Sequence, residues 1–91
     1  MKLCHALPAH LTEQALTLHE FANGGAQCHA RLKDGTVHSG LLVSNATAII
    51  AMRGHHDLPF AVDSVALLFQ TDEDRSPKVR GDWEFFDAWT S

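Results

Sequence analysis

Two different hydrophobic periods divide this chain. The first is helical: between residues 11 and 22 apolar side chains recur every three to four positions, and an Asn-Gly-Gly run at residues 23–25 ends the pattern. Thr12 stands at the N-cap position and Glu13 follows it, where a carboxylate suits the helix dipole. The pattern predicts one amphipathic helix over residues 13–22, whose apolar stripe packs on the rest of the protein. The members of this stripe are Leu11, Ala15, Leu18 and Ala22.

The second period is that of β-strands. After the glycines, apolar and polar residues alternate, and short apolar runs separated by polar turns follow as far as residue 70. Gly40 interrupts the second of these runs, where a glycine is typical of a sharp bend. One helix followed by five short strands indicates a mainly β fold, a strongly bent antiparallel small barrel with an N-terminal helix. The expected strands lie at residues 28–33, 37–43, 47–52, 58–62 and 66–70.

The Asp34-Gly35 pair predicts the turn of the first hairpin. In a two-residue loop of this type, Leu32 would face Val37 and Arg31 would face His38 across the two strands. This register directs one set of residues toward the core, namely Ala30, Leu32, Val37 and Leu41. It directs a second set toward solvent, namely His29, Arg31 and His38.

Composition divides the chain into a folded part and a tail. Residues 1–71 are expected to form one domain, because a chain of 91 residues is too short to bury two hydrophobic cores. Residues 72–91 begin as a polar stretch with Pro and Gly, which is typical of a linker, and end in an aromatic run. Within that run Trp83, Phe86 and Trp89 share a spacing of three. We expect these rings either to pack on the assembly or to bind a partner protein, and the sequence leaves both open.

Charge and composition narrow the classes of function. The formal net charge is -4, with the excess acid in the tail, so the chain lacks the broad basic field that general nucleic-acid binders use. No apolar run reaches the length of a membrane span and the first residues do not resemble a signal peptide. We therefore expect a cytoplasmic protein without membrane contact. Cys4 and Cys28 are isolated, which favours free thiols.

The order of these elements resembles the Sm-like family of small β-barrels. Gly35, Gly40 and Leu42 match the first motif of that family, in which one glycine lies at the hairpin and another in the bent second strand. Residues 60–69 look like the family's short fourth strand, tight turn and fifth strand. The resemblance covers residues 11–70. It implies a ring in which the fourth strand of one subunit pairs with the fifth strand of the next.

Many members of that family also bind uridine-rich RNA, through an acidic residue and a nearby Asn. Near those places this chain has Thr47 and Ile50, and neither side chain replaces a carboxylate or a base-reading amide. The resemblance therefore implies a divergent, non-enzymatic binding or scaffold protein of unknown ligand that assembles into a closed ring of about five to seven subunits. Two alternatives stay open. One is an RNA-binding Sm-like protein acting in RNA metabolism, and the other is a monomeric SH3-like adaptor that binds a peptide.

Self-assembly is favoured independently by the strands expected at residues 58–62 and 66–70, which carry no charge. Unpaired edge groups that no charged side chain protects tend to pair with another chain. Identical subunits joined edge to edge by a closing rotation would satisfy every such group. The side chains expected at this interface are Phe60, Val62, Leu67, Phe69, Trp83, Phe86 and Trp89.

Candidate ligand-binding residues are the cationic and titratable side chains of the predicted barrel. The group best suited to an anionic ligand or RNA lies on a polar loop after the third strand, with a second patch on the first strand. Seven histidines make pH-dependent assembly a further hypothesis. No metal or cofactor is predicted, and no catalytic residue, because Cys28 and His29 are neighbours on a strand and point to opposite faces. The candidate residues are Arg53, His55 and His56, and then Arg31 and Lys33.

Overall fold

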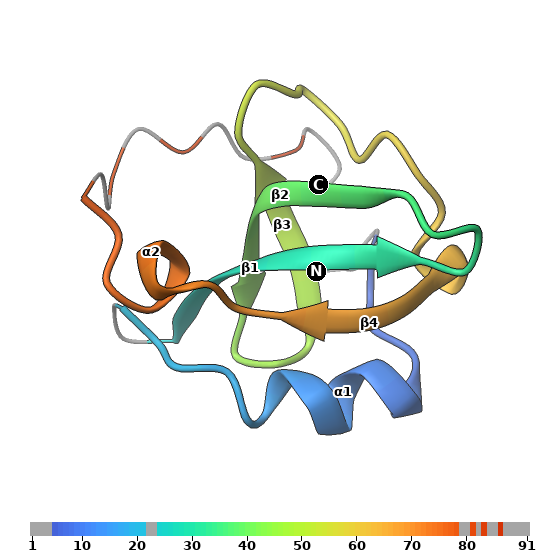
Figure 1. Ribbon diagram of the computed structural model, residues 1–91, viewed down its shortest axis with the longest axis horizontal. Coiled ribbons are helices and arrows are strands. Elements are labelled where there is room, and N and C mark those ends of the chain that lie inside the picture. Colours follow the sequence, from blue (N-terminus) through green and yellow to red (C-terminus); the bar gives the residue numbers. More distant parts are fainter. Residues whose placement is uncertain (1–4, 22–23, 79–80, 82, 84–85, 87–91) are drawn as a thin grey trace.

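A four-stranded antiparallel sheet forms the centre of the structure. The computed structural model describes residues 5–21, 24–78, 81, 83 and 86. The order across the sheet is β3-β2-β1-β4, with α1 along β4 and α2 beside β1 (Figure 1). In chain order the elements are α1 (Ala9–Ala15), β1 (Gly25–Leu32), β2 (Val37–Ser44), β3 (Ala48–Met52), a 3-10 helix (Val62–Ser64), β4 (Val65–Phe69) and α2 (Asp72–Arg75).

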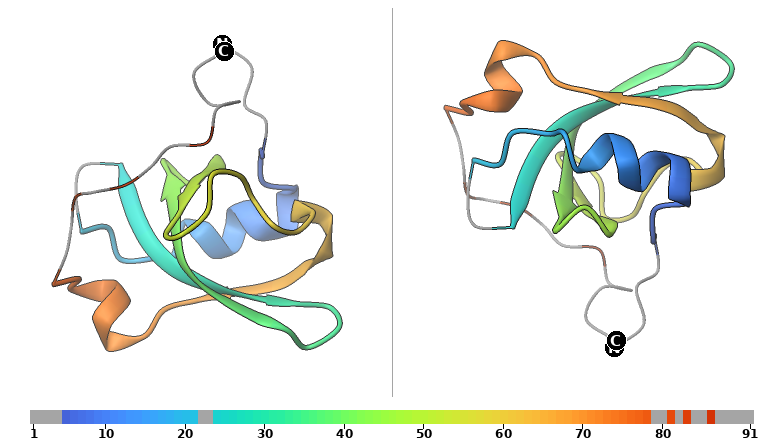
Figure 2. Two further views of the ribbon diagram at one scale, coloured as in Figure 1. Left: turned by 90° about the horizontal axis from the view of Figure 1, so that it is seen from above. Right: turned by 90° about the horizontal axis from the view of Figure 1, so that it is seen from below.

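The strand β1 links the two halves of this sheet. It pairs with β2 over most of its length and with β4 only through its last four residues. The β1–β2 register shifts between Cys28 and Ala30, close to Gly40, whose φ is +71°. Such a bulge bends a strand and increases its twist, and the two views of Figure 2 show the resulting curvature of β1 and β2. The mainly β fold with an N-terminal helix is confirmed.

The strand expected at residues 58–62 is not observed, and the sheet of the described residues is not closed. The apolar pattern there does correspond to burial, since Leu58 is 9% exposed and Phe60 packs against the core. However, Pro59 has no N–H for a strand ladder, and the 3-10 helix begins directly at Val62. This segment is therefore a loop that covers the end of the core.

The first hairpin has a three-residue loop, so the register expected from a two-residue loop is wrong. The Leu32 N–H donates to the Thr36 carbonyl at 2.7 Å, and Gly35 takes a φ of +93° as the third loop residue. A shift of one residue moves side chains to the other face. Val37 is accordingly 45% exposed instead of buried. His38 lies opposite Ala30 instead of sharing a face with His29 and Arg31, and its ring centroid is 4.7 Å from that of Phe60.

The helix α1 begins four residues earlier than expected and ends at Ala15. Pro8 occupies the N-cap position, and the Thr12 hydroxyl donates to the Pro8 carbonyl at 3.2 Å, so Thr12 lies inside the helix and does not cap it. Of the predicted stripe, Leu11 and Ala15 are buried and Leu18 is partly buried against the core, while Ala22 lies outside the described residues. The chain leaves the helical path because the next segment bonds elsewhere: the His19 N–H donates to Gln70 Oε1 at 2.8 Å.

Apolar side chains form two clusters, one on each side of the sheet. The main core contains Leu11, Cys28, Leu41, Val43, Ile49, Val65 and Phe86, among others. The second cluster contains Leu42, Ala48, Ile50 and Ala51, with Phe21 and Trp83 packed against it. Two of the three aromatic residues predicted to pack on the assembly or a partner therefore contact their own chain, while Trp89 lies outside the described residues.

Both outer strands of the sheet are bonded by other segments of the same chain. On β4, Gln14 Oε1 accepts the Leu68 N–H at 2.7 Å, and His10 Nε2–H donates to the Val65 carbonyl at 3.3 Å. At β3, three backbone hydrogen bonds join Leu7 N–H to the Thr47 carbonyl (2.8 Å), Ile49 N–H to the His5 carbonyl (3.1 Å) and Phe86 N–H to the Ile50 carbonyl (3.0 Å). Groups that could pair with another subunit are thus already engaged at these positions.

The place of Phe86 in the core gives a stability prediction. Its side chain is 1% exposed, so Phe86→Ala should lower the free energy of unfolding by about 3–5 kcal/mol, through lost burial and the cavity left behind. Urea unfolding followed by circular dichroism measures this loss. Leu16→Ala is the matched control, because Leu16 is 72% exposed and its truncation should change stability by less than about 0.5 kcal/mol. Equal unfolding midpoints for both variants would contradict the packing of Phe86.

Candidate functional site

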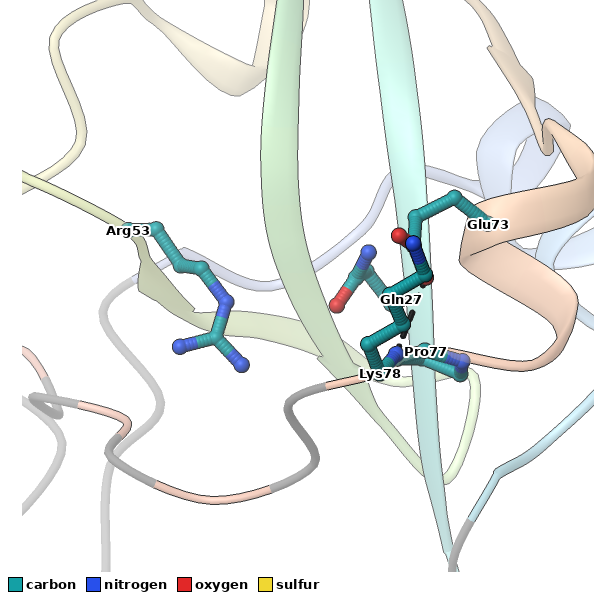
Figure 3. A pocket seen from close by; sticks show the side chains of 5 residues that line it. All are labelled: Gln27, Arg53, Glu73, Pro77 and Lys78. Carbon is teal, nitrogen blue, oxygen red and sulfur yellow. Dashed lines mark hydrogen bonds between the residues drawn. The ribbon is translucent and has the colours of Figure 1, made fainter.

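A hollow lies on the outer side of the sheet, where β1, the end of β3 and α2 approach one another. Its volume is about 390 Å³, and an adjoining hollow of about 450 Å³ shares Gln27, Arg53 and Glu73 with it. Figure 3 shows Gln27 and Arg53 turned toward one another across the first hollow. The first hollow is completed by Pro77 and Lys78, and the second by His29, Ser39, Gly40, Thr71 and Asp74.

The helix α2 is short but well defined at its start. The Thr71 Oγ1 accepts the Asp74 N–H at 3.3 Å, and the Thr71 N–H donates to Asp74 Oδ2 at 3.0 Å. This reciprocal pair is a capping box, which satisfies two N–H groups that a helix start otherwise leaves unpaired. The three acidic residues of α2 also lie where the helix dipole favours negative charge.

Asp74 is the polar centre of the site. Its side chain is 2% exposed and accepts hydrogen bonds from Gln27 Nε2 at 2.9 Å, from the Thr71 N–H, and from His29 Nδ1 at 2.6 Å. Burial of the carboxyl raises its pKa, but the hydrogen bonds from Gln27, Thr71 and His29 outweigh burial and hold the pKa below its ordinary value. The group is therefore a carboxylate at neutral pH, and His29 must carry its proton on Nδ1 to donate to it.

Gln27 has a donor that is bonded and an acceptor that is not. The residue is 7% exposed, and its Oε1 has no hydrogen-bond partner among the described residues. A carboxylate can only accept, so the NH2 group of Gln27 must face Asp74 and Oε1 must face away from it. An unpaired buried acceptor costs about 1–3 kcal/mol, and most such groups in native proteins have a partner.

Arg53 forms the opposite wall. Its Cζ lies 3.9 Å from the centroid of the Trp83 ring, and its Nη2 donates to the Gly81 carbonyl at 3.1 Å. The backbone holds this wall close to β2, because the Arg53 N–H donates to the Gly40 carbonyl at 2.9 Å. A Cβ at Gly40 would lie 3.2 Å from Arg53 Cβ, so only glycine permits this approach together with the positive φ.

The candidate binding residues expected from the sequence divide into two groups. Arg53 lines the hollow, whereas His55 and His56 are exposed on the loop that follows it. Arg31 and Lys33 are exposed near the first hairpin and line neither of the two hollows. Of the five candidates, Arg53 alone lines these two hollows.

Among the expected interface residues, those of β4 and the preceding loop are the most informative. Leu67 is 40% exposed, and it lies opposite Arg31, which in turn lies opposite the exposed Val37. Phe69 is half-buried, with its ring centroid 5.2 Å from that of His29. Phe60 and Val62, in contrast, pack against the main core of their own chain.

Sequence reasoning missed Gln27, His29 and Asp74 as site residues. Residues 72–82 were expected to be part of a linker, although Thr71 followed three residues later by an acidic residue is the pattern of a capping box. That signal could have located α2. Nothing in the local sequence indicates that α2 docks on Gln27 and His29, because these contacts join residues 45 and 47 positions apart.

The Cys28 thiol lies in the core, in surroundings that disfavour its ionised form. Burial, with a smaller contribution from the charge of Asp74, raises the pKa of Cys28 to about 12, so its thiolate is scarce. Within the described ranges, no three His, Cys, Asp or Glu side chains are grouped to hold a metal ion. In the same ranges, no helix is long and apolar enough to span a bilayer.

The low pKa of Asp74 predicts acid sensitivity of the α2 contact. Because its folded-state pKa lies below the unfolded value, its contribution to stability is complete above about pH 5 and is lost as the pH falls through the folded pKa. Asp74→Asn should therefore be less stable at neutral pH and should lose less stability between about pH 5 and pH 2. Urea unfolding at a series of pH values measures both effects.

The control for this pH series is Asp34→Asn. The Asp34 carboxyl accepts the Thr36 N–H at 2.9 Å but is fully exposed, so solvent should screen its contribution and the change should be smaller. The same acid dependence in Asp74→Asn and in the natural sequence would contradict the role of the buried carboxylate.

The buried state of Cys28 predicts that it resists thiol reagents. In a Cys4→Ser background, iodoacetamide at about pH 8 should modify Cys28 slowly in the folded protein and rapidly in denaturant, because the thiolate is the reactive form. Mass spectrometry of timed samples measures the two rates. Equal rates in native and denaturing buffer would show that the thiol is accessible and would contradict its burial.

Comparisons of the chain with protein-family models, curated proteins and solved structures found no match. Membership of the Sm-like family, the ring and the cytoplasmic location stay predictions.

Proposed function

We propose that this chain is a non-enzymatic binding domain whose ligand occupies the hollow between Gln27 and Arg53. The observation that carries this proposal is the buried Oε1 of Gln27, which lacks a partner while the rest of its amide is fixed by Asp74. Native proteins rarely leave a buried acceptor of this kind unpaired unless a ligand or another bound group pairs with it. The walls of the hollow come from β1, from the residue after β3, and from α2 with the segment that follows it, and they bring a few polar groups together in one concave place, as ligand sites do.

A second candidate function, which can coexist with the first, is self-assembly into a ring of the Sm-like kind. It is favoured by the exposed row of Val37, Arg31 and Leu67, which crosses three strands and ends on the outer strand β4. Positive φ values at Gly35 and Gly40, the two glycines of the resemblance, also support a divergent member of the Sm-like small-barrel family. Subunit pairing through β4 would require Gln14 and His10 to release the groups they now bond.

RNA is the alternative ligand, with Arg53, His55 and His56 as the contacts. Filter binding with uridine-rich and adenine-rich RNA at two salt concentrations tests this alternative, because phosphate contacts weaken with salt. If the ligand of the hollow is not RNA, neither RNA should show salt-sensitive binding. Salt-sensitive binding that is lost in Arg53→Ala would favour the RNA alternative.

The binding function itself is tested by mapping ligands on the protein surface. A library of short peptides, nucleotides and small polar molecules is screened by the shifts of backbone amide signals in 15N-labelled protein. We expect compounds that bind to shift the signals of Gln27, Arg53 and Lys78 together. A comparison site is the separate hollow near Leu16 and His19. Binding only at the hollow near Leu16 and His19, or no binding at all, would overturn the proposal.

The ring candidate predicts the mass of the protein in solution. Sedimentation should give about five to seven times the chain mass of 10.0 kDa, and a pH-dependent ring would change mass between about pH 8 and pH 5.5. Gln14→Ala frees the Leu68 N–H, so it should raise the proportion of oligomer if β4 pairs between subunits. Glu13→Ala, an exposed neighbour, is the control. A monomer in all three proteins would rule out the ring.

A further inference from the structure

The acceptor in the hollow has a fixed direction. Gln27 Nε2 donates to Asp74 Oδ1 at 2.9 Å, so a flip of the amide would place an oxygen against a carboxylate oxygen. Asp74 cannot turn away, because the Thr71 N–H and His29 hold its other oxygen at 3.0 Å and 2.6 Å. An amide that donates to a carboxylate is also polarised, which strengthens its own oxygen as an acceptor. The site is therefore built to receive a hydrogen-bond donor.

This acceptor lies where the two hollows meet. Both are lined by Gln27, Arg53 and Glu73, while Pro77 lines the first hollow alone and Ser39 the second alone. Two joined hollows of about 390 and 450 Å³ form a groove rather than a closed cavity. A groove of this form suits an extended chain better than a compact molecule.

The charges around the groove restrict the kind of donor. Arg53 and Lys78 line it, and their positive charges disfavour a ligand amine or guanidinium. Glu73 lines it as well, and the net charge of the chain is -4, so a phosphate backbone would meet like charge. A neutral N–H donor satisfies both restrictions. Main-chain amides are the commonest neutral N–H donors that proteins present.

We propose that the groove binds an extended peptide segment and that one main-chain N–H of this peptide donates to Gln27 Oε1. This inference rests on the binding function proposed above and specifies its ligand. The rim side chains of Glu73 and Lys78 are exposed, and rotamer changes of such residues are fast enough to admit a ligand. The peptide contributes the donor that the described residues do not supply.

A second buried atom without a partner belongs to a side chain that contacts Arg53, one of the residues lining the groove. Trp83 Nε1 is a donor that lacks an acceptor among the described residues. Trp83 packs on the cluster of Leu42, which lies directly opposite Gln27 on β2, and its ring faces Arg53. A peptide carries a carbonyl beside each N–H, so neighbouring groups of one chain supply both a donor and an acceptor.

Two small amides test the donor requirement on the natural protein. N-methylacetamide carries one N–H, whereas N,N-dimethylacetamide replaces it with a methyl group and keeps a similar shape. Each is titrated into 15N-labelled protein while the side-chain NH2 signals of Gln27 and the indole signal of Trp83 are followed. We expect N-methylacetamide to bind about five-fold more tightly, which is the usual value of one hydrogen bond. Equal affinity would overturn the donor requirement.

Two variants test whether Gln27 is the acceptor that causes the preference for N-methylacetamide. Gln27→Leu removes the acceptor at similar volume, so the two amides should then bind equally. Glu13→Leu is the control: Glu13 is exposed on α1 and lines neither hollow, so the preference should remain. If Gln27→Leu fails to fold, the comparison of the two amides on the natural protein still decides the question. A preference that persists in folded Gln27→Leu would overturn the assignment of Gln27.

A capped tri-alanine peptide tests the peptide class. It should shift the signals of Gln27, Ser39 and Lys78 at lower concentration than N-methylacetamide, and methylation of its central nitrogen should weaken binding about five-fold. Uridine monophosphate is the competing probe. Tighter binding of the nucleotide at Gln27 would overturn the assignment of a peptide as the ligand, but the hollow would still be a binding site. If no probe shifts the signals of the residues that line the groove, a bound water pairs with Gln27 Oε1 and the peptide inference fails. The screen of the compound library tests the binding function separately.

Discussion

The buried carboxylate of Asp74 is the interaction on which the arrangement around the groove depends. It caps its own helix through Thr71 and holds two side chains of β1, Gln27 and His29, so one group joins two elements that are distant in sequence. A buried charge is stable only when several donors surround it. The helix α2 has four residues and could not persist alone in water. Its position is therefore set by the hydrogen bonds of Asp74 rather than by helix propensity.

Satisfaction of polar groups also explains the borders of the sheet. An open sheet leaves N–H and C=O groups on its outer strands, and this chain pairs several of them itself, through Gln14 on β4 and through Leu7 and Phe86 at β3. A side-chain cap such as Gln14 is a weaker barrier than a backbone ladder, since one rotamer change removes it. The β4 border is therefore the more accessible of the two for a second subunit.

The sequence predicted the parts of the fold that depend on local pattern. The alternation along residues 28–33 and the glycines at positions 35 and 40 correctly indicated a bent hairpin, and Leu11 and Ala15 correctly indicated a buried helix face. The register was wrong because an Asp-Gly pair is compatible with loops of two or three residues, and periodicity alone does not distinguish them. Pro59 could have argued against the strand at residues 58–62.

The site was less predictable than the fold, because its residues have ordinary local contexts. Arg53 was a candidate because of its charge, and it lines the hollow. Gln27, in contrast, is one polar residue in a strand, and its amide is held only because Asp74 docks on it 47 positions later. The burial of Phe86 likewise depends on the return of the chain to the sheet. Long-range contacts of this kind are fixed by packing of the whole core, which a window of neighbouring residues does not contain.

The burial of Phe86 beside Leu11 in one core has a consequence for biosynthesis. During translation the strands emerge well before residue 86, so the ribosome-bound chain carries a core that lacks one of its largest rings. Incomplete cores expose apolar surface and are prone to aggregation, and contacts between residues distant in sequence form slowly. A nascent chain that has not yet released residue 86 therefore exposes apolar surface of its unfinished core and is prone to aggregation in that interval.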